Sequence, residues 1–351
     1  MTKVLAIETS CDETAAAVVE NGTKILSNIV ATQTEFHQKY GGIVPEIAAR
    51  KHVEVISPII QEALDTAKLP LKKIDAVAVT YGPGLIGSLI VGLCAAKALA
   101  WAIKKPLIGV NHLEGHIYAN MLAEMTNDKL QMTNKSKKSN LRDGSLFPLL
   151  CLLVSGGHTM IIHVKDHGKY ETIGRTRDDA AGEAFDKVAR VLGLGYPGGP
   201  VIDKLAKEGN PHAVKFKKPM IEDQYGYDFS FSGIKTSVIN FVNRDSISDI
   251  RKEDICASFQ NTVVITLVEK LIQAAKDKKV KTISIAGGVS ANSGLRNYLL
   301  ARADEEGLTA IIPPFEFCTD NAAMIGCAAY YKLKNGEKSD FHLKPQACLK
   351  L

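Results

Sequence analysis

One pattern of strands and turns occurs twice along the chain, and this repeat restricts the possible folds more than any other feature. In the first copy, three apolar strand-like runs span residues 4–7, 15–19 and 25–30, and a polar turn at residues 8–14 follows the first run. In the second copy, the three runs span residues 149–154, 161–164 and 170–174, and the polar turn lies at residues 155–159. Short apolar runs on both sides of a polar turn predict a β-hairpin. The sequence therefore predicts two hairpins with polar tips.

The first copy continues with a helix at residues 45–64 and a strand at 76–79. A glycine turn at 81–84 and a second helix at 88–103 come next. The second copy ends in the same way, with a strand at 282–285, a glycine turn at 287–292 and a helix through Ala303. Strands that alternate with helices predict an α/β fold. We expect a two-lobed protein built from duplicated βββαβα units, with both polar tips facing a central cleft.

A length of 351 residues suits two domains of ordinary size. We expect an N-terminal lobe at 1–123, a polar lysine-rich insertion or linker at 124–145, and a C-terminal lobe at 146–351 whose final helix, 320–333, returns toward the cleft. The insertion contains Lys135, Lys137 and Lys138 and no aromatic residue. This composition is typical of a solvated segment; a nucleic-acid-binding arm is the alternative.

The composition, with 46% hydrophobic and 23% charged residues, excludes disordered, collagen-like and coiled-coil proteins. Seven widely spaced cysteines without a C-x-x-C pair argue against a disulfide framework and a thiolate zinc site, so we expect a reducing, cytoplasmic setting. The net charge of +5 permits an anionic partner without demanding one. The apolar stretch 85–103 contains Lys97 and is expected to be a buried helix rather than a membrane span.

Two histidines with helical spacing form the first candidate site. His112 and His116 follow the apolar run 107–110, and on a helix the i, i+4 spacing places both imidazoles on one face, close enough to share a metal ion. The third ligand must come from elsewhere, and Asp320 is a candidate, although a carboxylate at a helix start is often only a cap. Two His and one Asp would leave coordination positions open, as catalytic Fe(II) or Zn(II) sites do.

Glycine turns and carboxylates form the second candidate site. Gly156-Gly157 and Gly287-Gly288 would allow the backbone to approach an anion, and the helix after Asn292 offers free N–H groups to phosphate. Asp186 would accept hydrogen bonds from ribose hydroxyls or a substrate amine, and Asp203 would join it. A structural role for each of these turns and carboxylates is the alternative. The sequence contains neither a Walker A loop nor a G-x-G-x-x-G that opens a helix.

Seven motifs, in this order, resemble the TsaD family of tRNA-modifying enzymes, and the match extends from about residue 4 to residue 333. They are ETSCDET at 8–14, HLEGH at 112–116, VSGGHT at 154–159, DAAGEAFD at 179–186, YPGGP at 196–200, FSFSG at 229–233 and AGGVSAN at 286–292. The stretch 179–200 resembles the bacterial and organellar branch of the family.

The resemblance implies a two-lobed actin-like ATPase (ASKHA) fold, in agreement with the repeat. It also implies an acyltransferase. Members of the family transfer the threonylcarbamoyl group from threonylcarbamoyl-AMP to N6 of the adenosine adjacent to the anticodon, in tRNAs that read codons beginning with A, and release AMP.

By motif position, the resemblance implies three groups of site residues. The metal ligands would be His112, His116 and Asp320, and the catalytic acidic tip would be Asp12 and Glu13. The substrate-binding residues would be Leu153, Val154, Ser155, Gly156, Gly157, Asp186, Gly199, Asp203 and Asn292. Glu13 as a base or orienting group is a hypothesis, and Cys11 need not act as a nucleophile because the acyl group arrives activated.

The resemblance further implies one divalent metal ion per subunit, with Fe²⁺ favoured over Zn²⁺. The expected partners are threonylcarbamoyl-AMP, tRNA, and either a paralogous ASKHA-fold dimerisation partner with a small ATPase or a second copy of the chain. No membrane partner is expected. The basic clusters are dispersed, such as Lys215, Lys217 and Lys218, and most of them are expected to be solvated helix and loop faces. We therefore expect tRNA binding through its phosphates with the help of partner proteins.

Three other functions compete with this interpretation. A metalloprotease would use Glu114 as its base, but the order here is H-x-E-x-H rather than H-E-x-x-H. A sugar or acetate kinase of the same fold class would use the hairpin tips and Gly287-Gly288, but such kinases do not require the His pair. A non-enzymatic tRNA-binding scaffold would require no metal.

Overall fold

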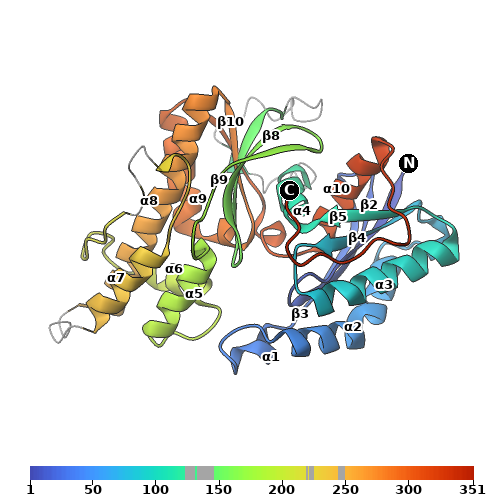
Figure 1. Ribbon diagram of the computed structural model, residues 1–351, viewed down its shortest axis with the longest axis horizontal. Coiled ribbons are helices and arrows are strands. Elements are labelled where there is room, and N and C mark those ends of the chain that lie inside the picture. The colour runs from blue at the N-terminus through green and yellow to red at the C-terminus, as the bar shows by residue number, and fades with distance from the viewer. Residues whose placement is uncertain (123–130, 133–145, 219, 221–224, 244–249) are drawn as a thin grey trace. The chain divides into compact units, whose positions relative to one another are not determined.

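The computed structural model describes residues 1–122, 131–132, 146–218, 220, 225–243 and 250–351. The chain forms two compact units: unit 1 contains Met1–Leu130 and Pro313–Leu351, and unit 2 contains Gln131–Ile312. The predicted boundaries assigned residues 313–351 to the C-terminal lobe. These residues belong to unit 1 because the helix α10 (Ala322–Lys334) packs against the N-terminal strands (Figure 1).

Unit 1 is built on a five-stranded sheet with the order β3-β2-β1-β4-β5. The strands are β1 (Lys3–Glu8), β2 (Glu13–Glu20), β3 (Lys24–Thr32), β4 (Ala76–Gly82) and β5 (Leu107–Asn111). β1, β2 and β3 are antiparallel neighbours, whereas β4 is parallel to both β1 and β5. The carboxyl ends of β1, β4 and β5 therefore lie at the same edge of the sheet.

Helices cover both faces of this sheet. The helices of unit 1 are α1 (Thr34–Gln38), α2 (Pro45–Thr66), α3 (Ile86–Ile103), α4 (His112–Leu122) and α10, with short 3₁₀ turns at Leu71–Lys73 and Phe315–Phe317. Leu5 and Ile7 of β1 point into the core beneath α2 and α3, whereas Ala6 faces Gly326 of α10. This alternation explains why β1 is apolar at every position from Val4 to Ile7, since both of its faces are buried.

Unit 2 repeats the same sheet order and adds one short strand at the edge, giving β6-β11-β10-β7-β8-β9. These strands are β6 (Gln131–Met132), β7 (Leu149–Val154), β8 (Thr159–Asp166), β9 (Lys169–Arg175), β10 (Thr282–Ala286) and β11 (Thr309–Ile312). β7, β8 and β9 are antiparallel neighbours, and β10 is parallel to both β7 and β11.

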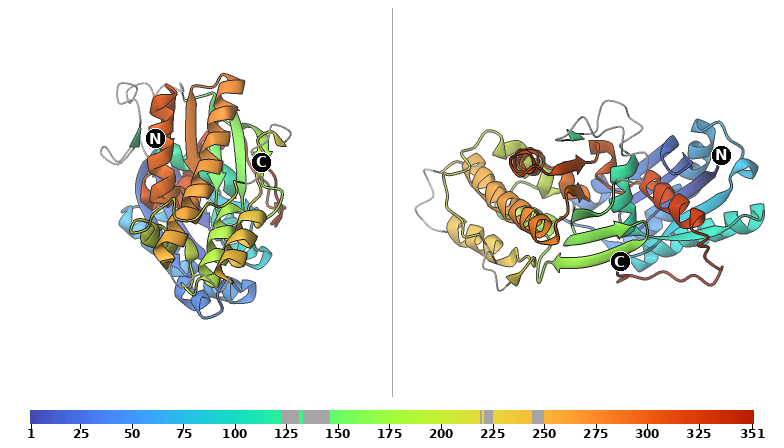
Figure 2. Two further views of the ribbon diagram at one scale, coloured as in Figure 1. Left: turned by 90° about the vertical axis from the view of Figure 1, so that its left-hand side faces the viewer. Right: turned by 90° about the horizontal axis from the view of Figure 1, so that it is seen from above.

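The helices of unit 2 are α5 (Ala181–Val191), α6 (Gly198–Ala206), α7 (Ser232–Val242), α8 (Lys252–Lys278) and α9 (Ser293–Glu305), with a 3₁₀ turn η4 (Gly288–Ala291). α8 packs against both α6 and α9, and Figure 2 shows the helices of unit 2 from two further directions. Their apolar faces form one core with Leu150, Leu152, Ile283 and Ile285 of the sheet.

The duplicated plan predicted from the sequence is confirmed in both units. Each unit continues the plan by one more parallel strand, β5 or β11, which the expected βββαβα pattern lacked. Of the predicted insertion at 124–145, only β6 is among the described residues, so Lys135, Lys137 and Lys138 lie outside them.

Two helices in the described part of the chain, α3 and α8, are long and apolar enough to cross a membrane by length and composition. α8 is largely buried among the other helices of unit 2. α3, which we expected to be buried, buries one face only. Ile86, Ile90 and Trp101 are exposed on the other face.

Candidate functional site

The His pair lies at the carboxyl end of β5, where the chain turns directly into α4. Asn111 ends the strand, and its side-chain oxygen accepts a hydrogen bond of 2.9 Å from the backbone N–H of Leu113. This contact satisfies one of the free N–H groups at the helix start. His112 and His116 then follow in the first two turns with their ring centroids 4.7 Å apart, so the predicted helical pair is confirmed.

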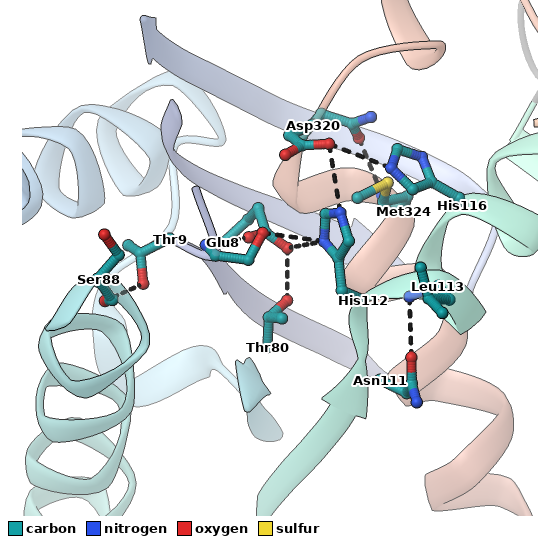
Figure 3. A network of polar contacts seen from close by, with 12 residues as sticks. Glu8, Thr9, Thr80, Ser88, Asn111, His112, Leu113, His116, Asp320 and Met324 are labelled. Atoms are coloured by element: carbon teal, nitrogen blue, oxygen red, sulfur yellow. Dashed lines mark hydrogen bonds and ion pairs between the residues drawn. The ribbon is translucent and has the colours of Figure 1, made fainter. Parts of the chain in front are cut away.

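Asp320 completes a three-residue cluster with this pair. Its Oδ1 lies 3.4 Å from Nε2 of His112 and 3.1 Å from Nε2 of His116 (Figure 3). The helix cap at this point is Asn321, whose Oδ1 accepts a 3.0 Å hydrogen bond from the N–H of Met324. Because Asn321 caps α10, the carboxylate of Asp320 is directed at the His pair.

The cluster has the chemistry of a metal centre. One ligand atom from each of the three residues lies within 4.8 Å of the others. Both ring nitrogens of His116 are buried and make no hydrogen bond to any described residue, and the Nε2 contact is the 3.1 Å approach of Asp320 Oδ1, so a cation between these two atoms would satisfy both. Burial lowers the pKa of His112, but the negative charges of Asp320 and Glu8 outweigh this effect and raise that pKa to about 9. The same negative charges attract a divalent cation.

Glu114 lies on the opposite side of α4 from the His pair. Its side chain is buried, and Oε2 lies 3.6 Å from Nζ of Lys332 on α10. In H-x-E-x-H on a helix, the Glu is rotated by about 200° from each His, so its side chain points away from the His pair. The ion pair of Glu114 with Lys332 connects α4 to α10. The position does not suit the base of a metalloprotease.

The acidic tip between β1 and β2 contains Cys11, Asp12 and Glu13. Buried contacts fix its backbone: Nε2 of His52 donates to the Cys11 carbonyl at 2.9 Å, and Gln33 N–H donates to the Asp12 carbonyl at 3.0 Å. Burial and the negative charges of Asp320 and Asp12 raise the pKa of Glu13 well above its usual value. Burial and the same kind of charges also raise the pKa of the Cys11 thiol, which argues against a thiolate nucleophile.

The end of β7 and the turn after it carry five of the predicted substrate-binding residues. The side chains of Leu153 and Val154 are fully buried, and both residues pair with β8, so neither side chain is available to a ligand. Gly156 and Gly157 are exposed, and a Cβ atom on either would meet no atom within 4 Å. Ser155 holds the turn, since its Oγ accepts a 3.1 Å hydrogen bond from the N–H of His158.

Two glycines allow other elements to approach this turn. Gly287 has φ +87°, and a Cβ there would lie 2.5 Å from the carbonyl oxygen of Val154. A Cβ on Gly182, at the start of α5, would lie 2.6 Å from the Ser155 carbonyl. The start of α5 and the turn after β10, the strand parallel to β7, therefore both lie against the end of β7.

Asp186 projects from α5 toward the start of α6. Its Oδ1 accepts a 2.8 Å hydrogen bond from the N–H of Gly198, and the N–H of Gly199 also donates to this carboxylate. Burial raises the pKa of Asp186, while these two N–H groups act in the opposite direction. The structure thus joins two predicted residues, Asp186 and Gly199, through the N-terminus of α6.

Asp203 and Asn292 are joined through a residue that the sequence interpretation missed. Gln260 of α8 donates to Asp203 Oδ1 at 3.1 Å and accepts from Nδ2 of Asn292 at 2.7 Å. Asp203 Oδ1 also accepts a hydrogen bond of 2.8 Å from the hydroxyl of Ser293. Asn292 Oδ1 caps α9 by accepting a hydrogen bond from the N–H of Leu295. A single Gln inside a 27-residue helix carries no sequence signal of this contact.

Glu8 is the second residue that the sequence interpretation left without a role. It is fully buried, and Oε2 lies 3.1 Å from Nδ1 of His112 (Figure 3). The available signal was a carboxylate at the end of a wholly apolar strand, because a buried acid requires specific partners.

The fold itself defines the class of protein. Full-length HypF, in a phosphate- and nucleotide-bound form, superposes with a TM-score of 0.59 at 15% identity, covering 96% of this chain and 47% of that one. Component A of the Acidaminococcus fermentans (R)-2-hydroxyglutaryl-CoA dehydratase superposes with a TM-score of 0.50 at 16% identity, covering 95% and 100%. The protein has the α/β actin-like ATPase fold.

Sequence similarity then defines the family. The family model TsaD, tRNA N6-adenosine threonylcarbamoyltransferase, matches residues 24–327. A tRNA N6-adenosine threonylcarbamoyltransferase of Clostridium botulinum is 53% identical over 350 residues, covering 99% of this chain and 97% of that one. A Clostridioides difficile protein of the same name is 52% identical, covering 99% and 98%. The chain belongs to the TsaD family and is a transferase, in agreement with the resemblance read from the motifs.

Proposed function

We propose that this enzyme transfers the threonylcarbamoyl group from threonylcarbamoyl-AMP to N6 of the adenosine adjacent to the anticodon, in tRNAs that read codons beginning with A. The N6 nitrogen attacks the carbamoyl carbon, a C–N bond forms, the bond from that carbon to the phosphate oxygen breaks, and AMP leaves. The amine loses one proton in this step. The observation that carries the proposal is the His112, His116 and Asp320 cluster in a chain of the TsaD family.

The metal would be held by His112, His116 and Asp320. A bound divalent cation supplies Lewis acidity toward carbonyl and phosphate oxygens. Two imidazoles and one carboxylate leave positions open and suit Fe²⁺ or Zn²⁺, and we favour one Fe²⁺ per subunit because this donor set is that of non-haem iron sites.

The residues of unit 1 and unit 2 would have different tasks. In unit 1, the buried acidic tip would orient the attacking amine, and Glu13 would accept its proton, because a raised pKa makes its carboxylate a stronger base. In unit 2, the N–H groups of Gly156 and Gly157 and the start of α9 at Asn292 would hold the adenylate phosphate, while Ser155 keeps the turn closed through its N–H to the His158 carbonyl. The free lone pairs of Asp186 and Asp203, with Gly199, would orient the nucleoside and the threonyl group.

Protein partners and location complete the proposal. We expect the enzyme to work in the cytoplasm with tRNA. Its partner would be a paralogous ASKHA-fold subunit together with a small ATPase, or a second copy of the chain. The net charge of +5 is small for a tRNA-binding protein, and partner proteins that share the contact with phosphates would explain it.

A direct transfer assay tests the reaction. The purified chain is incubated with threonylcarbamoyl-AMP and unmodified tRNA, with and without the candidate partners, and modified adenosine is measured by mass spectrometry. His112→Ala is expected to lose bound metal and to reduce transfer at least 100-fold, since removing a metal ligand disables the centre.

The matched control is His167→Ala. His163 and His167 have the same i, i+4 spacing, but they lie on β8 and in the turn after it rather than on a helix. This variant is expected to retain metal and activity. If the parent chain formed no modified adenosine with any combination of partners, the proposed reaction would be wrong.

A further inference from the structure

Glu8 is fully buried at the carboxyl end of β1, the central strand of unit 1. Three donors converge on its carboxylate. The N–H of Ser10 donates to Oε1 at 2.5 Å, the Thr80 hydroxyl donates to Oε2 at 2.5 Å, and Nδ1 of His112 lies 3.1 Å from Oε2. A buried carboxylate with this set of contacts joins β1, β4 and α4 at one point, as the close view shows (Figure 3).

We propose that Glu8 is a positioning residue for the metal centre. Its carboxylate holds the Nδ1–H of His112, and this contact presents Nε2 of the same ring to the metal. This inference rests on the metal site of the proposed function. It assigns to Glu8 a role in metal affinity rather than in the transfer step itself.

The geometry decides which ring nitrogen carries the proton. A neutral imidazole has one N–H and one lone pair, and a carboxylate only accepts hydrogen bonds. Because Nδ1 faces Oε2 of Glu8, the neutral ring that a metal requires keeps its proton on Nδ1 and has its lone pair on Nε2. That Nε2 is the atom that lies 3.4 Å from Asp320, within the three-residue cluster. Carboxylates that fix a ligating His in this way also raise the basicity of the ligand nitrogen.

The carboxylate is itself held rigidly. Thr80 belongs to β4, which is paired with β1 in parallel register, and Ser10 belongs to the turn that follows β1. The Ser10 hydroxyl also lies 3.1 Å from Nδ1 of His112. The ring therefore meets oxygen atoms of the β1 end on its Nδ1 side and Asp320 on its Nε2 side, so its orientation is determined before a metal binds.

An amide cannot replace this carboxylate. Glu8 accepts from three donors with two oxygens, whereas Gln offers one oxygen and an NH₂ group that itself donates. In Glu8→Gln the NH₂ group must face at least one of the donors on Ser10, Thr80 and His112. We expect this variant to keep the volume of the side chain and to weaken metal binding by about 10- to 100-fold.

The test uses the full chain and Co²⁺ ions alone. Dissociation constants are measured by competition with a coloured chelator, and the visible absorption of bound Co²⁺ reports the ligand geometry. Glu8→Gln is expected to raise the dissociation constant and to change the Co²⁺ spectrum. The matched control is Glu20→Gln, a buried acid on the neighbouring strand at the far end of the β1–β2 pair, where it contacts Lys3 and Lys24. This control is expected to bind Co²⁺ as the parent does.

A second measurement needs no substitution. Nitrogen NMR of the Zn²⁺-loaded parent, labelled at histidine, is expected to show His112 protonated at Nδ1 and metal-bound at Nε2. A proton at Nε2 would overturn the inference, even if Glu8→Gln fails to fold.

Failure of this inference is distinguishable from failure of the proposed function. If Glu8→Gln and the parent bind Co²⁺ equally and with the same spectrum, only the role of Glu8 is wrong. If the parent takes up no Co²⁺, both the role of Glu8 and the metal site fall, while the transfer assay still decides the reaction.

Discussion

At the scale of single residues, the carboxylates of unit 1 have different surroundings and therefore different chemistry. Glu8 is surrounded by hydrogen-bond donors, and although burial alone raises its pKa, its contact with His112 and the Thr80 hydrogen bond lower the pKa overall. Glu13 is partly buried near other negative charges, and its burial and these charges raise its pKa. One carboxylate is thus suited to hold a positive or donating group, and the other is suited to accept a proton.

Glu13→Gln tests this assignment. The substitution keeps the side-chain volume and removes the basic oxygen, so we expect single-turnover transfer from preformed threonylcarbamoyl-AMP to slow by about 10²-fold or more. Uptake of Co²⁺ is expected to remain unchanged, because Glu13 is not a ligand. Glu62→Gln, on the exposed face of α2, is the control and should transfer at the parent rate. Full transfer activity in Glu13→Gln would exclude Glu13 as the base.

At the scale of elements, α10 is positioned by close packing against the sheet that it covers. A Cβ on Gly326 would lie 2.7 Å from Cγ2 and 3.1 Å from Cβ of Val19 on β2. Val19 is β-branched and has little freedom to move. The glycine therefore allows α10 to lie directly on β1 and β2, and this position also determines where Asp320 meets the His pair.

Gly326→Ala is expected to lower the free energy of unfolding by about 1 kcal/mol, because overpacking costs about 1–3 kcal/mol and the gain in helix propensity is at most about 1 kcal/mol. Urea unfolding followed by circular dichroism measures the change. The control is Gly233→Ala in α7, where an added Cβ meets no atom within 4 Å, so its stability should be equal or higher. Equal stabilisation by both substitutions would show that α10 packs loosely against Val19 of β2.

At the scale of the whole molecule, each unit has its own hydrophobic core. The core of unit 1 gathers around Leu5, Ile7 and Val77, and that of unit 2 gathers around Leu150, Leu152 and Ile283. All three ligands of the candidate metal centre belong to unit 1. A ligand that binds only the folded form of one unit stabilises that unit by mass action.

Calorimetry should therefore show that a divalent metal raises one unfolding transition and not the other. At about 100 times the dissociation constant the stabilisation is about 2.7 kcal/mol, which corresponds to roughly 5–10 °C for a unit of this size. Gly326→Ala identifies the transition of unit 1 by lowering it, and His112→Ala should abolish the metal effect. A metal-dependent rise in the transition of unit 2 would contradict this assignment.

Local patterns were sufficient for much of the fold and for part of the site. Apolar runs with polar tips predicted the strands and their duplication because the direction of successive side chains along a strand or helix follows a fixed local period. The same local rule placed His112 and His116 on one face of a helix. β5 and β11 were missing from the expected plan because no glycine turn follows these short apolar runs, whereas a glycine turn follows both β4 and β10 and marked them as strands.

The sequence by itself thus determined the α/β repeat, the His pair and, through its motifs, the family. Only the tertiary structure decided which distant side chains complete the site. The parallel pairing of β1, β4 and β5 brings Glu8, Thr80 and His112 to one edge of the sheet. The close packing of α10 brings Asp320, which the sequence offered only as a candidate ligand, to the His pair, and α8 places Gln260 between Asp203 and Asn292. Such contacts depend on strand register and helix packing, which no local period encodes.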